Sequence, residues 1–189
     1  MPIWEWIVIA AVAVVLVVFA VVLVSMIRFR SKSKRLKQHY GSEYEQVVEQ
    51  TGSEKSAVRE LTTRERKRKK LDIVALTPSA LSEYTARWQE VQAGFVDNPA
   101  KAVGAADGLV TEVMRERGYP VDDFERQAAD ISVDHPQIVD DYRAAHGIHL
   151  AEHRADTEQQ REAFVHYRAL FATLLQAPAG NQEPLEETA

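Results

Sequence analysis

Residues 7–27 read IVIAAVAVVLVVFAVVLVSMI, a run of twenty-one residues with no charge and a single hydroxyl, that of Ser25. As an α-helix, a run of this length extends roughly 32 Å, enough to cross a hydrocarbon core of about 30 Å. Its many valines favour strands, but inside lipid a single segment satisfies all its backbone N–H and C=O groups only as a helix. The alternative is a buried core helix of a soluble protein, and a surface that is apolar on all sides argues against it. The sequence therefore predicts a single transmembrane helix at 7–27.

The residues that flank this run predict its orientation. Trp4 and Trp6 precede it, and indole rings favour the headgroup region at the edge of a span. Six basic residues follow it within ten positions: Arg28, Arg30, Lys32, Lys34, Arg35 and Lys37. Because such segments stay on the cytoplasmic side, we expect residues 1–6 outside the inner membrane and the remaining chain in the cytoplasm. The six cations are expected to lie in a juxtamembrane linker, 28–41, against anionic headgroups.

A cleaved signal peptide is the rival interpretation. It requires a positive segment before the apolar run, a shorter run, and a small-x-small cleavage site after it. Ala11 and Ala13 have the required spacing but lie inside the run, and the other two features are missing. We therefore expect an uncleaved anchor.

The charge of the chain is divided between its two parts. Residues 1–37 carry six Lys/Arg and one acid, whereas residues 38–189 carry seventeen Lys/Arg and twenty-seven Asp/Glu. The net charge of the body is therefore −10, which disfavours nucleic acid as a ligand because phosphates require a positive face. The chain has no cysteine, and this excludes disulfides, thiolate metal sites and cysteine nucleophiles.

After the anchor, the pattern predicts an all-α body, so the fold class is a single transmembrane helix followed by a small multi-helix bundle. Two short helices and an extended strap at 71–76 are expected within 42–76, since a lone strand there would have nothing to pair with. The bundle domain is expected at 77–176. The small, polar and acidic segment 177–189 predicts a disordered tail.

Polar residues mark the expected helix starts. The predicted caps are Ser42, Ser53, Thr77 (before Pro78), Asn98 (before Pro99), Asp122, Asp134 and Asp156. The last two are each followed three positions later by a glutamine, Gln137 and Gln159, as in a capping box. Gly52 and Gly118 are expected to end helices.

Apolar residues at 3-4-3-4 spacing define the clearest amphipathic helix: Leu81, Tyr84, Trp88, Val91 and Phe95. The last helix carries a broad apolar face that includes Phe164, Tyr167 and Phe171. We expect these eight residues in the core, with Trp88 buried against the last helix.

The basic stretch 64–70, RERKRKK, ends the second short helix. Basic residues in a last turn complement the helix dipole, and a solvated, protruding helix end is the first interpretation. Contact with lipid headgroups or with an acidic partner is the functional alternative.

Three histidines, His146, His149 and His153, lie at i, i+3 and i+7 and so share one helical face. Such a cluster can bind zinc, with Glu152 or an acid from a neighbouring helix completing the shell. Three ligands on one helix close a tetrahedral cage poorly, however, and the face also carries apolar residues. Histidines packed and hydrogen-bonded within the core are the main interpretation, and metal binding or pH sensing is the alternative.

Enzymatic signatures are missing from the sequence. Adjacent acids such as Asp140-Asp141 point about 100° apart on a helix, so they do not form a catalytic carboxylate pair. Gly104 and Gly108 form no phosphate loop, because no strand precedes them and no lysine follows at the required spacing, but they permit close helix packing. No GxSxG or HExxH motif is present. We therefore expect neither an enzyme nor a bound cofactor.

Four segments carry a resemblance: YGSEYEQVVEQTG (40–52), FVDNPAKAVGAADGLVTEVMRERGYP (95–120), FERQAADISVDHPQIVDDYRAAH (124–146) and TEQQREAFVHYRALFATLL (157–175). With these segments the chain resembles an uncharacterised family of bacterial proteins described as hypothetical, membrane or secreted. The resemblance implies a small helical domain behind an anchor and brings no activity with it. We expect a non-enzymatic module that binds a protein partner; a metal- or pH-responsive sensor is the alternative.

Overall fold

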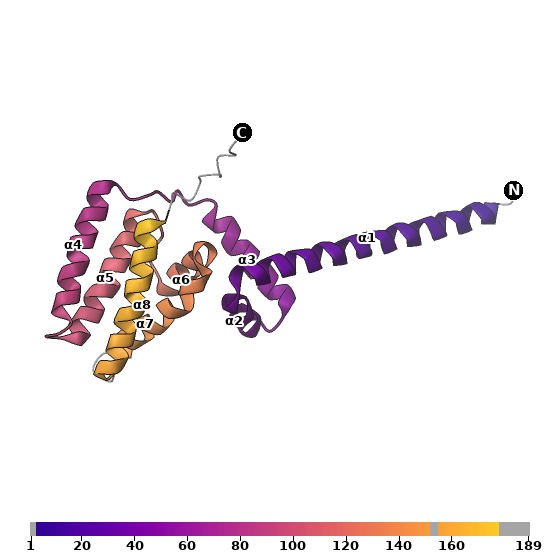
Figure 1. Cartoon of the computed structure of the whole chain (residues 1–189). Coiled ribbons are helices and arrows are strands. Elements are labelled where there is room, and N and C mark those ends of the chain that lie inside the picture. Colours follow the sequence, from indigo (N-terminus) through magenta and orange to yellow (C-terminus); the bar gives the residue numbers. More distant parts are fainter. Residues whose placement is uncertain (1–2, 152–154, 178–189) are drawn as a thin grey trace, which may run out of the picture.

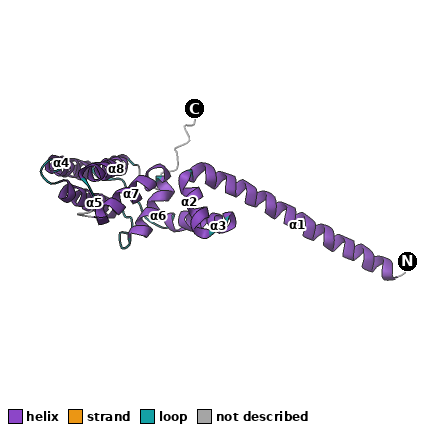
Figure 2. Cartoon of the chain, turned by 90° about the horizontal axis from the view of Figure 1, so that it is seen from below, coloured by secondary structure: helices purple, strands orange, loops and turns teal. Residues whose placement is uncertain are grey.

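The structure, a computed structural model, describes residues 3–151 and 155–177. These residues contain eight α-helices and one short 3₁₀ helix, joined by loops. Within α1, the side chains of residues 3 and 5–14 are outside this description. The helices are α1 (Ile3–Tyr40), α2 (Ser42–Thr51), α3 (Glu54–Arg68), α4 (Pro78–Gly94), α5 (Pro99–Glu116), α6 (Phe124–Asp134), η1 (Pro136–Ile138), α7 (Val139–Ala151) and α8 (Thr157–Gln176) (Figure 1). Figure 2 shows helices and loops in these residues and no strand, which confirms the all-α class.

The first helix, α1, continues without a break from Ile3 to Tyr40 and projects from the rest of the molecule (Figure 1). The segment predicted as a linker, 28–41, is therefore helical as far as Tyr40. Leu36 and Tyr40, one turn apart on the same face, are buried against the helices that follow. The basic segment is thus the last part of a continuous helix whose end packs against the body.

The C-terminal end of α1 packs with α2 and α3 into a small unit, here called the N-terminal unit. Its apolar core consists of Leu36, Tyr40, Tyr44, Val47, Ala57, Val58 and Leu61. Gly52 ends α2 in the left-handed conformation, with φ of 72°, where glycine pays no steric penalty. The chain can therefore reverse between α2 and α3 and place both helices against α1.

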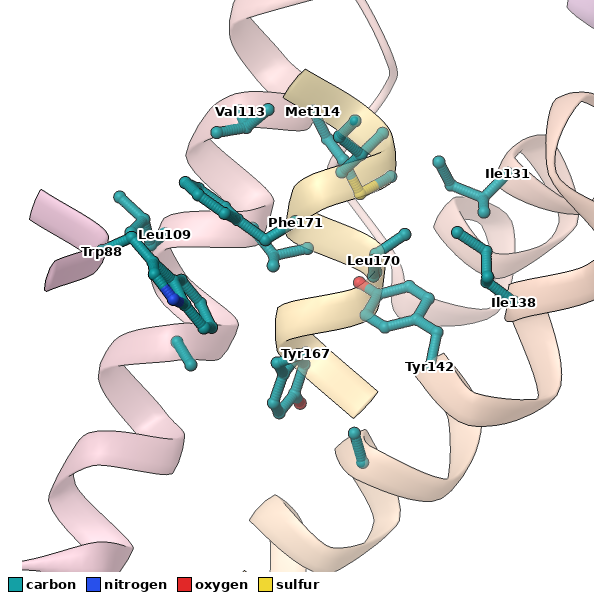
Figure 3. Close-up of a cluster of buried hydrophobic side chains, with 14 of the residues drawn as sticks. Trp88, Leu109, Val113, Met114, Ile131, Ile138, Tyr142, Tyr167, Leu170 and Phe171 are labelled. Atoms are coloured by element: carbon teal, nitrogen blue, oxygen red, sulfur yellow. The ribbon is translucent and has the colours of Figure 1, made fainter. Parts of the chain in front are cut away.

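Helices α4 to α8 form the bundle, in which α8 packs on both α5 and α7 (Figure 1). Trp88 of α4 stacks on two rings of α8, with centroid distances of 4.6 Å to Phe171 and 5.2 Å to Phe164. Figure 3 shows Trp88 and Phe171 beside Leu109 of α5. Trp88 thus packs against the last helix as its spacing predicts.

The eight residues predicted for the core differ in burial. Tyr84, Trp88, Phe164, Tyr167 and Phe171 are buried. Leu81, Val91 and Phe95 are half-buried. Leu81 and Val91 lie on α4 and Phe95 is the C-cap that follows it. This helix packs mainly on α5 at the edge of the bundle, so part of its apolar face stays accessible.

Four of the predicted caps are present. Ser53, Thr77 and Asn98 each accept a hydrogen bond from the backbone N–H three residues later. Asp156 and Gln159 exchange side-chain and backbone hydrogen bonds of 2.8 and 2.9 Å, which confirms the predicted capping box.

Three predicted caps are wrong, because another residue takes the position or the carboxylate has a tertiary partner. The N-cap of α2 is Gly41, and the Ser42 hydroxyl donates instead to Asp140 at 2.7 Å. Asp123, one residue after Asp122, caps α6. Asp134 is the last residue of α6, where its carboxylate accepts hydrogen bonds from Tyr119 and Arg68.

Residues 71–76 cross the bundle in an extended conformation without pairing as a strand, which agrees with the predicted strap. Ile73 is buried, and the Val74 N–H donates to the Arg117 carbonyl at 3.0 Å. Gly118 has φ of 94°, and a Cβ there would lie 2.5 Å from the Asp72 carbonyl oxygen. Glycine at this position therefore permits both the turn after α5 and the close approach of the strap.

Candidate functional site

The apolar half of α1 that the structure describes is exposed on all sides. From Val15 to Ile27, its large apolar side chains are 43–66 % exposed. Exposed apolar surface of this extent marks a region that contacts lipid or protein. In the residues whose side chains are described, no helix offers an apolar stretch of sufficient length to cross a membrane. The side chains of residues 7–14, the first part of the predicted span, are outside the description.

The six cations after this stretch fall into two groups. Arg35 pairs with Glu65 of α3 at 2.8 Å, and Lys37 pairs with Glu45 of α2 at 2.6 Å. The hydrogen bond that Lys37 donates to Glu45, together with the negative charge of Glu45, raises the pKa of Lys37. The other four, Arg28, Arg30, Lys32 and Lys34, make no ion pair with any residue that the structure describes. The four cations nearest the apolar stretch are therefore available to bind an anion outside the chain.

A buried ion cluster joins the N-terminal unit to the bundle. Glu43 of α2 has no exposed surface, and its carboxylate accepts hydrogen bonds from Arg64 of α3 at 2.6 Å and from Arg143 of α7 at 2.5 and 3.0 Å. The hydrogen bond to Glu43 raises the pKa of Arg143. One carboxylate thus holds three helices together.

A second ion cluster lies on the same boundary. Arg68 of α3 is buried and pairs with Asp134 of α6, which also accepts from the Tyr119 hydroxyl at 2.5 Å. Burial, together with the charge of Asp134, raises the pKa of Tyr119. His39 of α1 shares a 2.9 Å hydrogen bond with the Val133 carbonyl. We call the polar boundary formed by these two clusters the seam. Its residues are Glu43, Arg64, Arg143, Arg68, Asp134, Tyr119 and His39.

The seam corrects the interpretation of the basic stretch 64–70 as a solvated, protruding helix end. Arg64 is half-buried and Arg68 is buried, and both pair with carboxylates of the seam: Arg64 with Glu43 of α2, and Arg68 with Asp134 of α6. Arg66, Lys67, Lys69 and Lys70 are exposed, and their contact with headgroups or an acidic partner stays a prediction.

Sequence reasoning missed Glu43, although one signal was present. Glu43 lies four residues before Val47 and next to Tyr44, so it falls on the apolar face of its helix. An acid on such a face is rarely buried unless it is paired. This signal predicts a buried ion pair, but the two arginines lie 21 and 100 residues away and cannot be named from the local pattern.

The histidine face is engaged within the bundle. The His146 ring stacks in parallel on Phe124 of α6 with a centroid distance of 3.6 Å, and its Nδ1 lies 3.2 Å from Asp107 of α5. The Tyr167 hydroxyl of α8 donates to the same Asp107 oxygen at 2.7 Å. Burial alone would raise the pKa of Asp107, but the hydrogen bonds from His146 and Tyr167 outweigh it and lower the pKa.

The structure places two of the three predicted metal ligands, His146 and His149. His149 lies against Gly104 of α5, with its ring centroid 6.1 Å from that of His146, and His153 lies outside the described residues. Within the described part of the chain, no three His, Asp or Glu side chains are arranged to hold a metal ion. Zinc binding therefore stays a prediction, which a zinc-dependent rise in melting temperature, lost when all three are replaced by glutamine, would support.

Comparison with known proteins gives no match. No protein-family model, no curated protein and no solved structure is similar to the chain at a significant level. The resemblance to an uncharacterised bacterial family therefore stays a prediction.

Proposed function

We propose that this chain is a single-pass membrane protein of a bacterial inner membrane, anchored by residues 7–27, with residues 1–6 outside and the helical body in the cytoplasm. In this arrangement Arg28, Arg30, Lys32 and Lys34 contact anionic headgroups. Each basic residue near such a surface contributes about 1 kcal/mol. The body acts as a non-enzymatic module that binds a protein partner at the membrane.

One observation carries this proposal: the change along α1 from exposed apolar side chains to unpaired cations. The apolar run is uninterrupted in the sequence from Ile7 to Ile27, and the next cation is Arg28. The four cations nearest the run lack an ion pair in the described residues, whereas Arg35 and Lys37, one to two turns further on, are bound to acids of the body. Cations at the lipid boundary and ion pairs beyond it are the expected distribution for a helix that leaves a bilayer.

The acidic body supports the second half of the proposal. A net charge of −10 for residues 38–189 keeps the bundle away from an anionic leaflet, while the cations of α1 hold the base of the helix on it. Because α1 is one continuous helix that packs on the body through Leu36 and Tyr40, this helix connects the body directly to the proposed anchor. This is a suitable geometry for presenting a binding surface to a partner.

A reporter fusion tests the proposed topology. A reporter that is active only in the cytoplasm, fused after Ala189, should be active, and the fusion should remain in the membrane fraction after an alkaline carbonate wash. Replacing the four unpaired cations with glutamine should reduce the fraction of chains in this orientation, because Lys and Arg bias sets topology. The matched control replaces four exposed cations of α3, namely Arg66, Lys67, Lys69 and Lys70, and should leave the orientation unchanged. A reporter that is inactive in the unaltered fusion, or a fusion released by the wash, contradicts the proposal.

A further inference from the structure

A pocket of about 330 Å³ opens at one end of the bundle, remote from the seam, between the first turn of α5, the end of α7 and the first turn of α8. Its apolar wall is formed by Val103 and Ile148, and its polar residues are Asn98, Lys101, His149 and Gln160. The volume is at the lower end of the range for small-molecule sites, which are mostly apolar with a few polar groups that orient the ligand.

The shape of the pocket depends on Gly104. A Cβ at this position would lie 3.2 Å from Cε1 and 3.7 Å from Nδ1 of His149, closer to Cε1 than most carbon contacts allow. The absence of a side chain at 104 therefore lets the imidazole lie directly against α5 and form part of the pocket wall. The sequence predicts close helix packing at Gly104. In the structure, the group that packs closely there is the His149 ring.

The electrostatics of the pocket favour an anion. Among the described residues, no carboxylate lines it, and the Lys101 ammonium group makes no ion pair. His149 adds an imidazole, which has no hydrogen-bond partner in the described part of the chain. The ammonium group of Lys101 offers a charge-assisted hydrogen bond to a carboxylate, and the imidazole of His149, which lines the same pocket, offers a second one. The apolar wall suits a short hydrocarbon or aromatic group.

We propose that this pocket binds a small organic carboxylate, with Lys101 and His149 holding the carboxylate and Val103 and Ile148 contacting the apolar part. The ligand is a free small molecule, because the pocket is too small for a folded partner. The inference does not depend on the membrane anchor, so either proposal can fail without the other. The proposed site would make the cytoplasmic body a receptor for a metabolite of this chemical class.

The test uses benzoate as the probe and the full chain, uniformly labelled with ¹⁵N, in lipid nanodiscs. Benzoate should cause saturable amide shifts at residues 98, 100–104 and 148–149, with a Kd in the millimolar range. Benzamide, which has the same shape without the charge, should cause much smaller shifts. Lys101→Gln should weaken benzoate binding about tenfold, the loss expected for one charge-assisted hydrogen bond. Lys55→Gln, at an exposed position of α3, is the matched control and should leave binding unchanged.

Gly104→Ala provides a second variant that acts through the shape of the pocket. The added methyl group displaces the His149 ring and should weaken benzoate binding while the amide spectrum of the remaining bundle is preserved. No saturable shift in the pocket, equal shifts with benzoate and benzamide, or equal binding by the wild type and Lys101→Gln would each overturn the proposal. Tighter binding of a peptide that ends in a free phenylalanine carboxylate would overturn the assignment to a free small molecule.

Discussion

Glu43→Gln removes the carboxylate that Arg64 and Arg143 share in the first ion cluster of the seam, while preserving the shape of the side chain. Glu43 is fully buried, and the side chains of its partners Arg64 and Arg143 are 12 % and 21 % exposed. Breaking a buried ion pair costs about 3–5 kcal/mol, because the charge that remains is desolvated and unpaired. Here water reaches part of both guanidinium groups, Arg64 keeps Glu60 at 3.1 Å, and Arg143 keeps Asp140 at 3.5 Å. We therefore expect a smaller cost, about 2 kcal/mol, as for the loss of hydrogen bonds to a charged group. Such a loss is a large share of the free energy of unfolding of a small domain.

Urea unfolding of the full chain in nanodiscs, followed by circular dichroism, measures this cost. The matched control is Glu45→Gln, two residues away on the same helix, where the carboxylate pairs with Lys37 in solvent. Exposed pairs contribute little, so the control should lose only a small fraction of the free energy lost by Glu43→Gln.

A double-mutant cycle with Arg143→Gln then separates the ion pair from general packing. Residues in one ion-pair network typically show coupling energies of about 0.5–3 kcal/mol. Equal costs for Glu43→Gln and Glu45→Gln, or a cycle that is additive within error, would refute the conclusion that Glu43 joins α2 to α7.

Three further changes test the bundle. Trp88→Ala should lower the free energy of unfolding by about 3–5 kcal/mol, because the indole is buried and stacks on two aromatic rings. Arg66→Ala, at an exposed position, should change it very little. Equal effects would show that core and surface are assigned wrongly. Gly118→Ala should cost more than about 1 kcal/mol, since it combines a positive φ with contact to the strap, and a neutral result in thermal unfolding would contradict this. The lowered pKa of Asp107 gives stability that is present above its ordinary value of 3.8 and is lost as the pH falls through the lower folded value. Unfolding measured from pH 6 to pH 2 should therefore depend less on pH in Asp107→Asn, and an unchanged pH profile would argue against the His146 and Tyr167 contacts.

The parts of the fold set by local sequence were predictable. The 3-4-3-4 spacing around Trp88 indicates the buried face of α4, and Thr77 and Asn98 mark helix starts because a cap needs only the next turn of the chain. The capping box of Asp156 and Gln159 is local for the same reason. These signals depend on neighbours within a few residues, so they do not require knowledge of the tertiary structure.

The seam could not be predicted in detail, because its partners are distant in the sequence. Ser42 has the local pattern of a cap, yet its hydroxyl bonds to Asp140, 98 residues away. Asp134 has the pattern of a capping box, yet Arg68 and Tyr119 take its carboxylate. Where a polar side chain has both a local and a tertiary partner available, only the packed structure determines which one it binds.

The central claim, that residues 7–27 cross the membrane and place the body in the cytoplasm, can be tested by single-cysteine labelling, which is direct because the chain has no native cysteine. Pro2→Cys and Ala93→Cys, the latter at an exposed position of α4, are each labelled in cells whose outer barrier is opened and whose inner membrane is intact, using a maleimide that does not cross membranes. With residues 1–6 outside and the body in the cytoplasm, Pro2→Cys should react at once, and Ala93→Cys should react only after the inner membrane is permeabilised. Labelling of Ala93→Cys before permeabilisation would contradict the account.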